Sequence, residues 1–293
     1  MALIKLSLPN HAKVRMPNLS TLTFPVISFL TMALLCWATL QQFSAATPYH
    51  RAPITSQTSI HKTPAKKDPA PGNSPAAKNT TLQDVIRDSK QSIVKVEAEG
   101  CGGYIFQGTG FFVTPDVVIT NAHTVAGTSY ISVASGDYKH RAVAIHFDAR
   151  SDYALLRLHT VKGKPLPLST HSQGAYVLGT NNGLRVAVLG YPEGSYKAQQ
   201  SIIRNEFLSA SYNIYGEQIE NSQTLELAAQ IRSGNSGSPV IMKNGQVAGM
   251  ITGIDAANEN IAYATPVSEF YKQVQSAKKP KDAVPTQACV NND

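Results

Sequence analysis

Twelve short runs rich in β-branched and apolar residues follow one another between residues 92 and 264, each bounded by Gly, Pro, Asn or Asp. Such runs are typical of β-strands. A parallel sheet would need crossover helices between its strands, and no helical pattern separates these runs. The sequence therefore predicts an all-β fold, and twelve strands suffice for two packed six-stranded barrels. The runs are Ser92–Val96, Gly108–Val113, Val117–Thr120, Tyr130–Val133, Ala142–His146, Tyr153–Leu158, Arg185–Leu189, Gln200–Leu208, Thr224–Leu227, Pro239–Met242, Gln246–Thr252 and Ile261–Ala264.

Two helical patterns flank the strand-rich region. Thr81 is a capping-type residue followed by apolar residues at helical spacing, which predicts a short first helix. Near the end, Pro266 opens a segment in which apolar residues recur at i, i+3, i+4 and i+7 from Val267 to Val274. That spacing, with Pro in the first turn, predicts one amphipathic C-terminal helix.

The positive charge of the chain is confined to its first 80 residues. The net charge of +7 comes from eight Lys/Arg and one Asp in residues 1–80, whereas residues 81–293 contain eighteen cations and eighteen anions. A globular composition, 42% hydrophobic and 15% charged, argues against a disordered chain. Because the predicted domain has no net positive field, we expect no nucleic-acid partner.

An uncharged segment extends from Met16 to Pro48, and its centre, Phe24–Leu40, is almost wholly apolar. Seventeen helical residues come near the lower limit for crossing a bilayer. The cations that precede the segment favour a cytoplasmic N-terminus, which would leave everything after it outside the cytoplasm. The sequence favours a single-pass signal anchor. A signal peptide cleaved near Ser44-Ala45-Ala46, which would release a secreted protein, is the alternative.

These patterns divide the chain into four parts. Residues 1–23 are expected to be a cytoplasmic segment and residues 24–46 the anchor or signal peptide. Residues 47–80, rich in Pro, Ser, Thr, Ala and Lys, cannot bury enough apolar surface to fold and are expected to be a tether. Residues 81–293 form the predicted domain.

Two cysteines remain beyond the tether, Cys101 and Cys289, near the two ends of the predicted domain. An oxidising compartment would permit a disulfide between them, tying the C-terminal tail to the first strands. Two free buried thiols are the alternative.

Three segments contain residues suited to nucleophilic catalysis. The first ends in Thr120-Asn-Ala-His123, directly after a predicted strand. The second, Ser151-Asp152-Tyr-Ala-Leu-Leu, places an acid just before another strand, and Asp148 is a second candidate acid. The third, Gly234-Asn-Ser236-Gly-Ser-Pro239, places a Ser in a Gly-flanked turn.

Acyl transfer to water needs a nucleophile, a base and an acid that orients the base. We therefore expect Ser236, His123 and Asp152 to fill these roles, with Asp152 preferred to Asp148 because it directly precedes the buried strand. Backbone N–H groups must also face the developing oxyanion, and the glycines around Ser236 allow those of Gly234 and Ser236 to point the same way.

The three segments, taken together and in the order His, Asp, Ser, resemble the corresponding blocks of trypsin-like serine proteases of the chymotrypsin fold. An α/β-hydrolase would have its Ser first. The run Val188-Leu-Gly-Tyr-Pro192, Cys101 and the tail around Cys289 resemble in particular the bacterial membrane-anchored proteases of the MarP type. The HtrA/DegP proteases are a more distant resemblance. The likeness covers about residues 83–290 and implies two barrels and serine endopeptidase activity without a cofactor or metal.

The resemblance also implies a substrate pocket. Gln230 aligns with the base of the pocket for the residue whose carbonyl is attacked, called P1, and Thr252, Gly253 and Ile254 align with the strand that pairs with the substrate backbone. No acid aligns with the pocket base, so an uncharged P1 residue is expected. Asn235 replaces the Asp that zymogen-activated members use to bind a new N-terminus, which suggests a site formed without such insertion.

The sequence predicts an endopeptidase that acts on proteins or peptides outside the cytoplasm, in envelope processing or quality control. A protease-fold binding or sensing module and an esterase on the same fold are the alternatives.

Overall fold

The computed structural model describes residues 80–136, 138–170 and 183–290 of the 293-residue chain. The cytoplasmic segment, the anchor and all of the tether except residue 80 lie outside the described residues. Within the described ranges, no helix is both long enough and apolar enough to cross a membrane.

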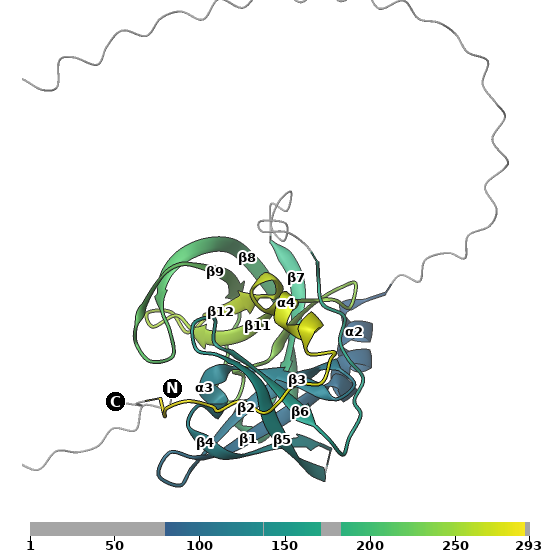
Figure 1. Ribbon diagram of the computed structural model, residues 1–293. Coiled ribbons are helices and arrows are strands. Elements are labelled where there is room, and N and C mark those ends of the chain that lie inside the picture. The colour runs from purple at the N-terminus through teal and green to yellow at the C-terminus, as the bar shows by residue number, and fades with distance from the viewer. Residues whose placement is uncertain (1–79, 137, 171–182, 291–293) are drawn as a thin grey trace, which may run out of the picture. The chain divides into compact units, whose positions relative to one another are not determined.

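The first barrel is closed by six antiparallel strands in the order β1-β2-β3-β6-β5-β4 (Figure 1). A four-residue helix, α3 (Ala122–Val125), follows β3 and carries His123. The strands are β1 (Ile93–Gly100), β2 (Tyr104–Thr114), β3 (Val117–Thr120), β4 (Thr128–Ser135), β5 (Tyr138–Asp148) and β6 (Tyr153–Leu158).

The second barrel is also closed and antiparallel, in the order β10-β11-β12-β9-β8-β7. Its longest hairpin joins β8 to β9 and pairs Tyr212 with Gln218 near the tip. The strands are β7 (Leu184–Gly190), β8 (Lys197–Tyr212), β9 (Gln218–Ala228), β10 (Pro239–Met242), β11 (Val247–Ile254) and β12 (Ile261–Pro266). A 3₁₀ turn, η2 (Pro192–Gly194), connects β7 to β8.

Three apolar clusters explain why several strands are apolar on both faces. One cluster fills each barrel, and the third lies between the barrels. In β3, Val118 points into the first barrel whereas Val117 and Ile119 belong to the cluster between the barrels. Neighbouring side chains point to opposite faces of a strand, so a strand between two cores has no polar face. Strand β3, which leads into His123, therefore lies between two apolar clusters.

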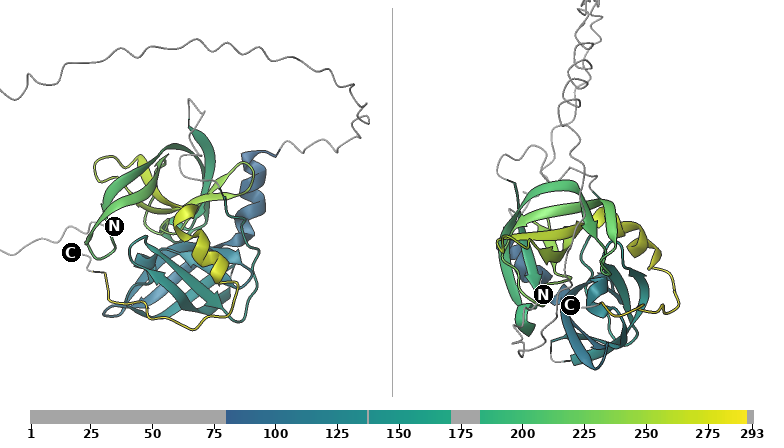
Figure 2. Two further views of the ribbon diagram at one scale, coloured as in Figure 1. Left: turned by 45° about the horizontal axis from the view of Figure 1, so that its top comes forward. Right: turned by 90° about the vertical axis from the view of Figure 1, so that its left-hand side faces the viewer.

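Two helices cover the cluster between the barrels (Figures 1 and 2). Helix α2 (Leu82–Ser89) begins with a capping box in which Thr81 and Asp84 exchange hydrogen bonds, and a single 3₁₀ turn, η1 (Lys90–Ser92), leads into β1. Helix α4 (Val267–Ser276) buries Phe270, whose ring centroid lies 5.9 Å from that of Tyr153. The C-terminal segment then runs along the outside of the first barrel (Figure 2).

The predicted all-β class, the two six-stranded barrels and the C-terminal helix are confirmed. Every predicted strand is present, but most are longer than expected. Strand β8, for example, extends over sixteen residues where the sequence indicated only Gln200–Leu208. The added residues are largely polar or exposed, so they lack the apolar character on which the prediction rested.

Candidate active site

His123 and Asp152 meet through two hydrogen bonds although 29 residues separate them. The imidazole Nδ1 lies 2.7 Å from Asp152 Oδ2, and the backbone N–H of His123 donates to Asp152 Oδ1 at 2.9 Å. Antiparallel pairing of β3 with β6 brings the two segments together, since Thr120 at the end of β3 lies opposite Ala154 near the start of β6. Asp148 lies apart from this pair and accepts the backbone N–H groups of Arg150 and Ser151.

The backbone of Asp152 adopts an unusual conformation that Asn121 holds in place. Asp152 has φ of +50°, in the left-handed region that non-glycine residues seldom occupy. Asn121 is fully buried, and its Nδ2 donates to the carbonyl of Asp152 at 2.8 Å. Its Oδ1 is buried and has no hydrogen-bond partner within the part of the chain that the structure describes. The hydrogen bond from the Asn121 side chain therefore supports the backbone conformation of Asp152.

The pKa of His123 reflects two opposing influences. Burial of the imidazole lowers its pKa, whereas the charge of the Asp152 carboxylate and the hydrogen bond to it raise the pKa more, so that the net shift from 6.5 is upward. The carboxylate also fixes the tautomer: Nδ1 carries the proton toward Asp152, which leaves Nε2 free to accept a proton.

Ser236 occupies a tight turn between β9 and β10, and two positions of this turn require glycine. Gly234 and Gly237 have φ of +93° and +87°. A Cβ on Gly237 would lie 1.9 Å from the carbonyl oxygen of Thr109, and one on Gly234 would lie 2.4 Å from that of Tyr191. The turn therefore packs its backbone directly against β2 of the first barrel at Gly237 and against the residue after β7 at Gly234.

Thr109 of β2 fastens this turn to the first barrel. Thr109 is fully buried, and its Oγ1 donates to the carbonyl of Gly234 at 2.7 Å and accepts the N–H of Tyr191 at 2.9 Å. Its own N–H donates to the carbonyl of Ser236 at 2.7 Å. One residue of the first barrel thus fixes three backbone groups of the second.

Two backbone N–H groups of the turn are free. The carbonyl of Ser233 accepts the N–H of Glu193 at 2.8 Å. Because C=O and N–H of a trans peptide point in opposite directions, the N–H of Gly234 points away from Glu193. Within the described part of the chain, the N–H groups of Gly234 and Ser236 donate to no protein atom.

The Ser236 turn and the His123 segment approach each other across Gly108. A Cβ on Gly108 would lie 2.8 Å from Cγ2 of Thr124, the neighbour of His123, and 3.1 Å from the carbonyl oxygen of Ser236. Among the described residues, no hydrogen bond joins the Ser236 hydroxyl to His123.

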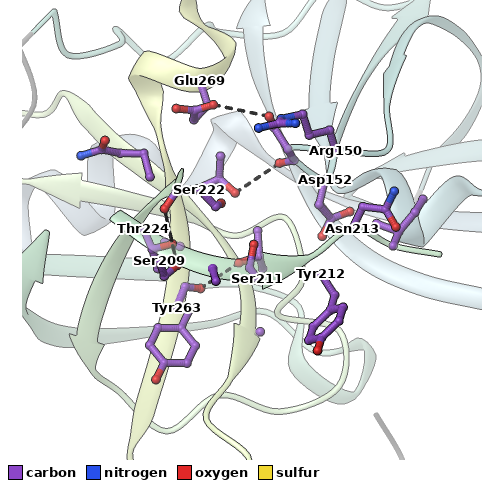
Figure 3. A pocket seen from close by; sticks show the side chains of 18 of the residues that line it. Arg150, Asp152, Ser209, Ser211, Tyr212, Asn213, Ser222, Thr224, Tyr263 and Glu269 are labelled. Carbon is purple, nitrogen blue, oxygen red and sulfur yellow. Dashed lines mark hydrogen bonds between the residues drawn. The ribbon is translucent and has the colours of Figure 1, made fainter. Parts of the chain in front are cut away.

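A cavity of about 480 Å³ opens beside His123 and Asp152 (Figure 3). Of the four residues predicted to bind substrate, Thr252 and Gly253 line this cavity, whereas Ile254 and Gln230 do not. Ile254 is 44% exposed, and the side chain of Gln230 is exposed and donates to Asn260 at 2.6 Å. Sequence reasoning missed the β8–β9 hairpin as a wall of this cavity.

A disulfide joins Cys101 to Cys289, closing a loop of 188 residues. In the described ranges, no three His, Cys, Asp or Glu side chains gather in a way that could hold a metal ion.

Asn121 and Thr109 were not singled out from the sequence. Their partners are backbone atoms 31 and 125 residues away, which no local motif indicates.

Comparison with known proteins agrees with this architecture. The family model described as a trypsin-like peptidase domain matches residues 108–250. The serine protease Rv3671c of Mycobacterium tuberculosis is 30% identical over 250 residues, which are 83% of this chain and 56% of that protein. The crystal structure of the active form of the Rv3671c protease aligns with a TM-score of 0.65 at 28% identity, covering 85% of this chain and all of that one.

A more distant relative is a probable periplasmic serine endoprotease of DegP-like type from Chlamydia pneumoniae. The two are 29% identical over an alignment that covers half of this chain and 29% of that protein. The chain spans about half the length, or less, of the curated relatives named here. The matched sequence blocks, the two barrels and the His-Asp pair lead to one assignment: the chain contains a trypsin-like peptidase domain.

Proposed function

We propose that this protein is a serine endopeptidase that hydrolyses peptide bonds through an acyl-enzyme. Ser236 is the nucleophile, His123 the general base and acid, and Asp152 the residue that orients His123. The backbone N–H groups of Gly234 and Ser236 form the oxyanion hole. The reaction needs no cofactor or metal.

The observation that carries the proposal is the double hydrogen bond between His123 and Asp152 beside a Gly-flanked Ser turn. The free N–H groups of that turn supply the second requirement, donors without a competing protein acceptor. Catalytic hydrogen bonds are often long without substrate, so the proposal requires the Ser236 hydroxyl to reach Nε2 only when a peptide is bound.

Each residue then has one task in the reaction. Nε2 removes the proton of Ser236 as Oγ attacks the peptide carbonyl. The resulting oxyanion accepts hydrogen bonds from the N–H groups of Gly234 and Ser236. His123 returns the proton to the leaving amine, which departs and leaves the acyl group on Oγ. Water then attacks the acyl carbon with His123 as base, releasing the carboxylic acid and restoring Ser236.

The proposed place of action is outside the cytoplasm. Residues 24–46 would anchor the protein in the membrane by a single pass, and residues 47–80 would tether the protease domain. A disulfide persists in an oxidising compartment, which supports this location. The proposed substrates are proteins of the cell envelope, cleaved during processing or quality control after an uncharged residue.

A fluorophosphonate probe on the full chain tests the proposal. We expect labelling of wild type, mapped to Ser236, and none of Ser236→Ala. Peptide hydrolysis by Ser236→Ala should fall to at most roughly 10³–10⁴-fold over water. Ser268→Ala, which removes an exposed hydroxyl on α4, is the control and should be labelled normally. Near-normal peptidase activity of Ser236→Ala would overturn the assignment, and cleavage of esters but not amides would favour an esterase.

A further inference from the structure

The cavity beside the catalytic pair has walls from both barrels (Figure 3). Arg150 and Asp152 come from the turn before β6, Ser209 and Ser222 from the β8–β9 hairpin, and Glu269 from the first turn of α4. The hairpin tip is held to the turn by a hydrogen bond from the N–H of Ile214 to the carbonyl of Ala149, 3.3 Å long. The cavity is therefore formed by elements of both barrels that are hydrogen-bonded to each other.

Three hydroxyl groups around the cavity donate hydrogen bonds to acceptors of the protein. Thr252 Oγ1 donates to the carbonyl of Tyr263 and Thr265 Oγ1 to that of Ser151, both at 3.3 Å. Ser151 Oγ donates to Glu269 Oε2 at 3.4 Å. A hydroxyl has one proton and two lone pairs, so groups whose proton is already bound offer mainly acceptors to a ligand.

The hairpin wall repeats this pattern. Ser209 Oγ donates to the carbonyl of Ser222 at 3.4 Å and lies 3.2 Å from Thr224 Oγ1. Thr224 Oγ1 can donate to the same carbonyl at 3.5 Å. Both hydroxyls therefore have protein acceptors for their protons and can present lone pairs to the cavity.

One carboxylate of the lining has an oxygen that can bind a cationic ligand. Glu269 adds a carboxylate in which Oε1 has no hydrogen bond within the described residues, whereas both oxygens of Asp152 are bound to His123. Arg150 is exposed, and its guanidinium donates to the carbonyl of Glu220, which is not a lining residue. The aromatic rings of Phe207 and Tyr212 can cover the aliphatic stem of a long side chain.

The position of the cavity distinguishes it from the expected P1 pocket. Gln230, which aligns with the base of that pocket, does not line the cavity, whereas Gly253 of β11 and His123 do. Successive side chains of an extended peptide point to opposite sides. If the P1 side chain points toward Gln230, the preceding residue, P2, points toward the cavity. A Cβ on Gly253 would meet nothing within 4 Å, so the approach is open.

We propose that this cavity is a binding site for a lysine or arginine side chain at position P2 of the substrate. The ammonium or guanidinium group donates to Glu269 and to the hydroxyl lone pairs, and the stem lies against the aromatic rings. The inference rests on the proposed endopeptidase function and adds a substrate class to it.

Four peptides that differ only at P2, with lysine, arginine, norleucine or glutamate, test this specificity in the full chain. We expect kcat/KM to be roughly tenfold higher for lysine and arginine than for norleucine, and lowest for glutamate, because hydrogen bonds to charged groups are the stronger ones. Norleucine matches the lysine stem and lacks only the charge. Equal rates for lysine and norleucine would overturn the proposal.

Glu269→Gln removes the charge while keeping the shape of the side chain. It should lower the ratio of kcat/KM for the lysine peptide to kcat/KM for the norleucine peptide about threefold to fivefold. This is the size of effect that a partly exposed ion pair has on binding. Glu99→Gln, which removes an equal charge from an exposed site on β1 outside the cavity, is the matched control and should leave the ratio as in wild type. Glu269→Lys should raise kcat/KM for the glutamate peptide relative to kcat/KM for the lysine peptide. The same ratio in Glu269→Gln and Glu99→Gln would contradict the site.

Fluorophosphonate labelling separates this proposal from the one on which it rests. If Ser236 is labelled and peptides are cleaved without a preference for cations at P2, the cavity assignment fails and the endopeptidase stands. If Ser236 is not labelled and no peptide is cleaved, both fail together.

Discussion

The two halves of the active site are held in different ways. The first barrel supplies His123 and Asp152, which are fixed by side-chain hydrogen bonds within that barrel, including the one from Asn121. The second barrel supplies the Ser236 turn, whose backbone depends on positive-φ glycines and on Thr109, a residue of the other barrel. The first half is self-contained, whereas the second is shaped at the interface between the barrels.

This difference predicts where mutations will act. Changes in the first half should alter the basicity and orientation of His123. Changes at the interface should alter the proposed oxyanion hole and leave the His-Asp pair intact. Turnover, its pH dependence and stability therefore report on different parts of the site, and the following predictions are ordered by their expected effect on turnover.

The largest of these effects is expected at the acid. Asp152→Asn should lower kcat about 10⁴-fold, since an amide favours the wrong tautomer of His123. Asp148→Asn is the matched control four residues earlier, and it should be mild because the amide oxygen can still accept the N–H groups of Arg150 and Ser151. Steady-state peptide hydrolysis measures both. The reverse ranking would show that Asp148 is the orienting acid.

The next effect is expected where the two halves meet. Thr109→Val keeps the shape of the side chain but removes its hydrogen bonds to Gly234 and Tyr191. We expect kcat to fall roughly tenfold to a hundredfold, somewhat less than for loss of an oxyanion donor itself. Thr114→Val removes a hydroxyl from the same strand, where it contacts Asp116 and not the turn.

Thr114→Val should lose about 1 kcal/mol of stability, the usual cost of one hydrogen bond, and Thr109→Val about 2 kcal/mol, because it breaks two. Only Thr109→Val should slow turnover. Equal losses of kcat in the two variants would mean that the interface supports the fold without shaping the site.

A smaller effect is expected from Asn121→Ala, which frees the strained backbone of Asp152. The strained backbone of Asp152 stores about 1–3 kcal/mol, and without Asn121 it can relax to another conformation. The carboxylate should then bind His123 less firmly, and we expect kcat to fall by roughly tenfold or less. KM should change little, because Asn121 is buried away from the substrate.

The pH profile of Asn121→Ala is the more specific measurement. Catalysis needs the neutral imidazole, and Asp152 raises the pKa of His123. Wild type should therefore lose activity as the pH falls through a value above 6.5, and weakening the contact should move this limb of the kcat/KM profile to lower pH. A lower kcat with an unmoved limb would assign Asn121 a purely structural role.

Much of the fold was predictable because each strand has an apolar segment between turn residues. Strands β3, β6 and β10 have the predicted bounds, since they are buried on both faces. The hairpin of β8 and β9 was underestimated because its outer half consists of polar or exposed residues. That half lines the cavity beside His123, so the part of the fold that sequence patterns did not indicate is the part on which the proposed specificity rests.

The site was predictable only where it depends on short motifs. The His, Asp and Ser segments stand out because their residue types and order suit acyl transfer. Thr109 and Asn121 did not, because they act on backbone atoms brought close by strand pairing and barrel packing. Only coordinates relate such residues to the atoms that they hold.

The smallest effect on turnover is expected from the Cys101–Cys289 disulfide, although its effect on stability is large. The chain-entropy model gives about 5 kcal/mol for so long a loop. The bridge also secures a tail that touches the first half of the site: Gly127, just after α3, donates to the carbonyl of Thr286 at 3.0 Å, and Val284 donates to Ala144 at 2.8 Å. These two hydrogen bonds do not replace a covalent bond, so we expect the double variant Cys101→Ser, Cys289→Ser to loosen this tail before either barrel opens.

Hydrogen exchange resolves this order of events. In the double variant the amides of Gly127 and Val284 should exchange faster, while those of β3 and β6 should keep their protection, and turnover of the folded protein should change least among all the variants. Loss of protection in β3 together with a large loss of turnover would show that the first half of the site is not self-contained.

Alkylation without reductant, read by mass spectrometry on protein taken from its native compartment, should find no free thiol at Cys101 or Cys289. Two alkylated cysteines would contradict both the bridge and the oxidising location inferred from it.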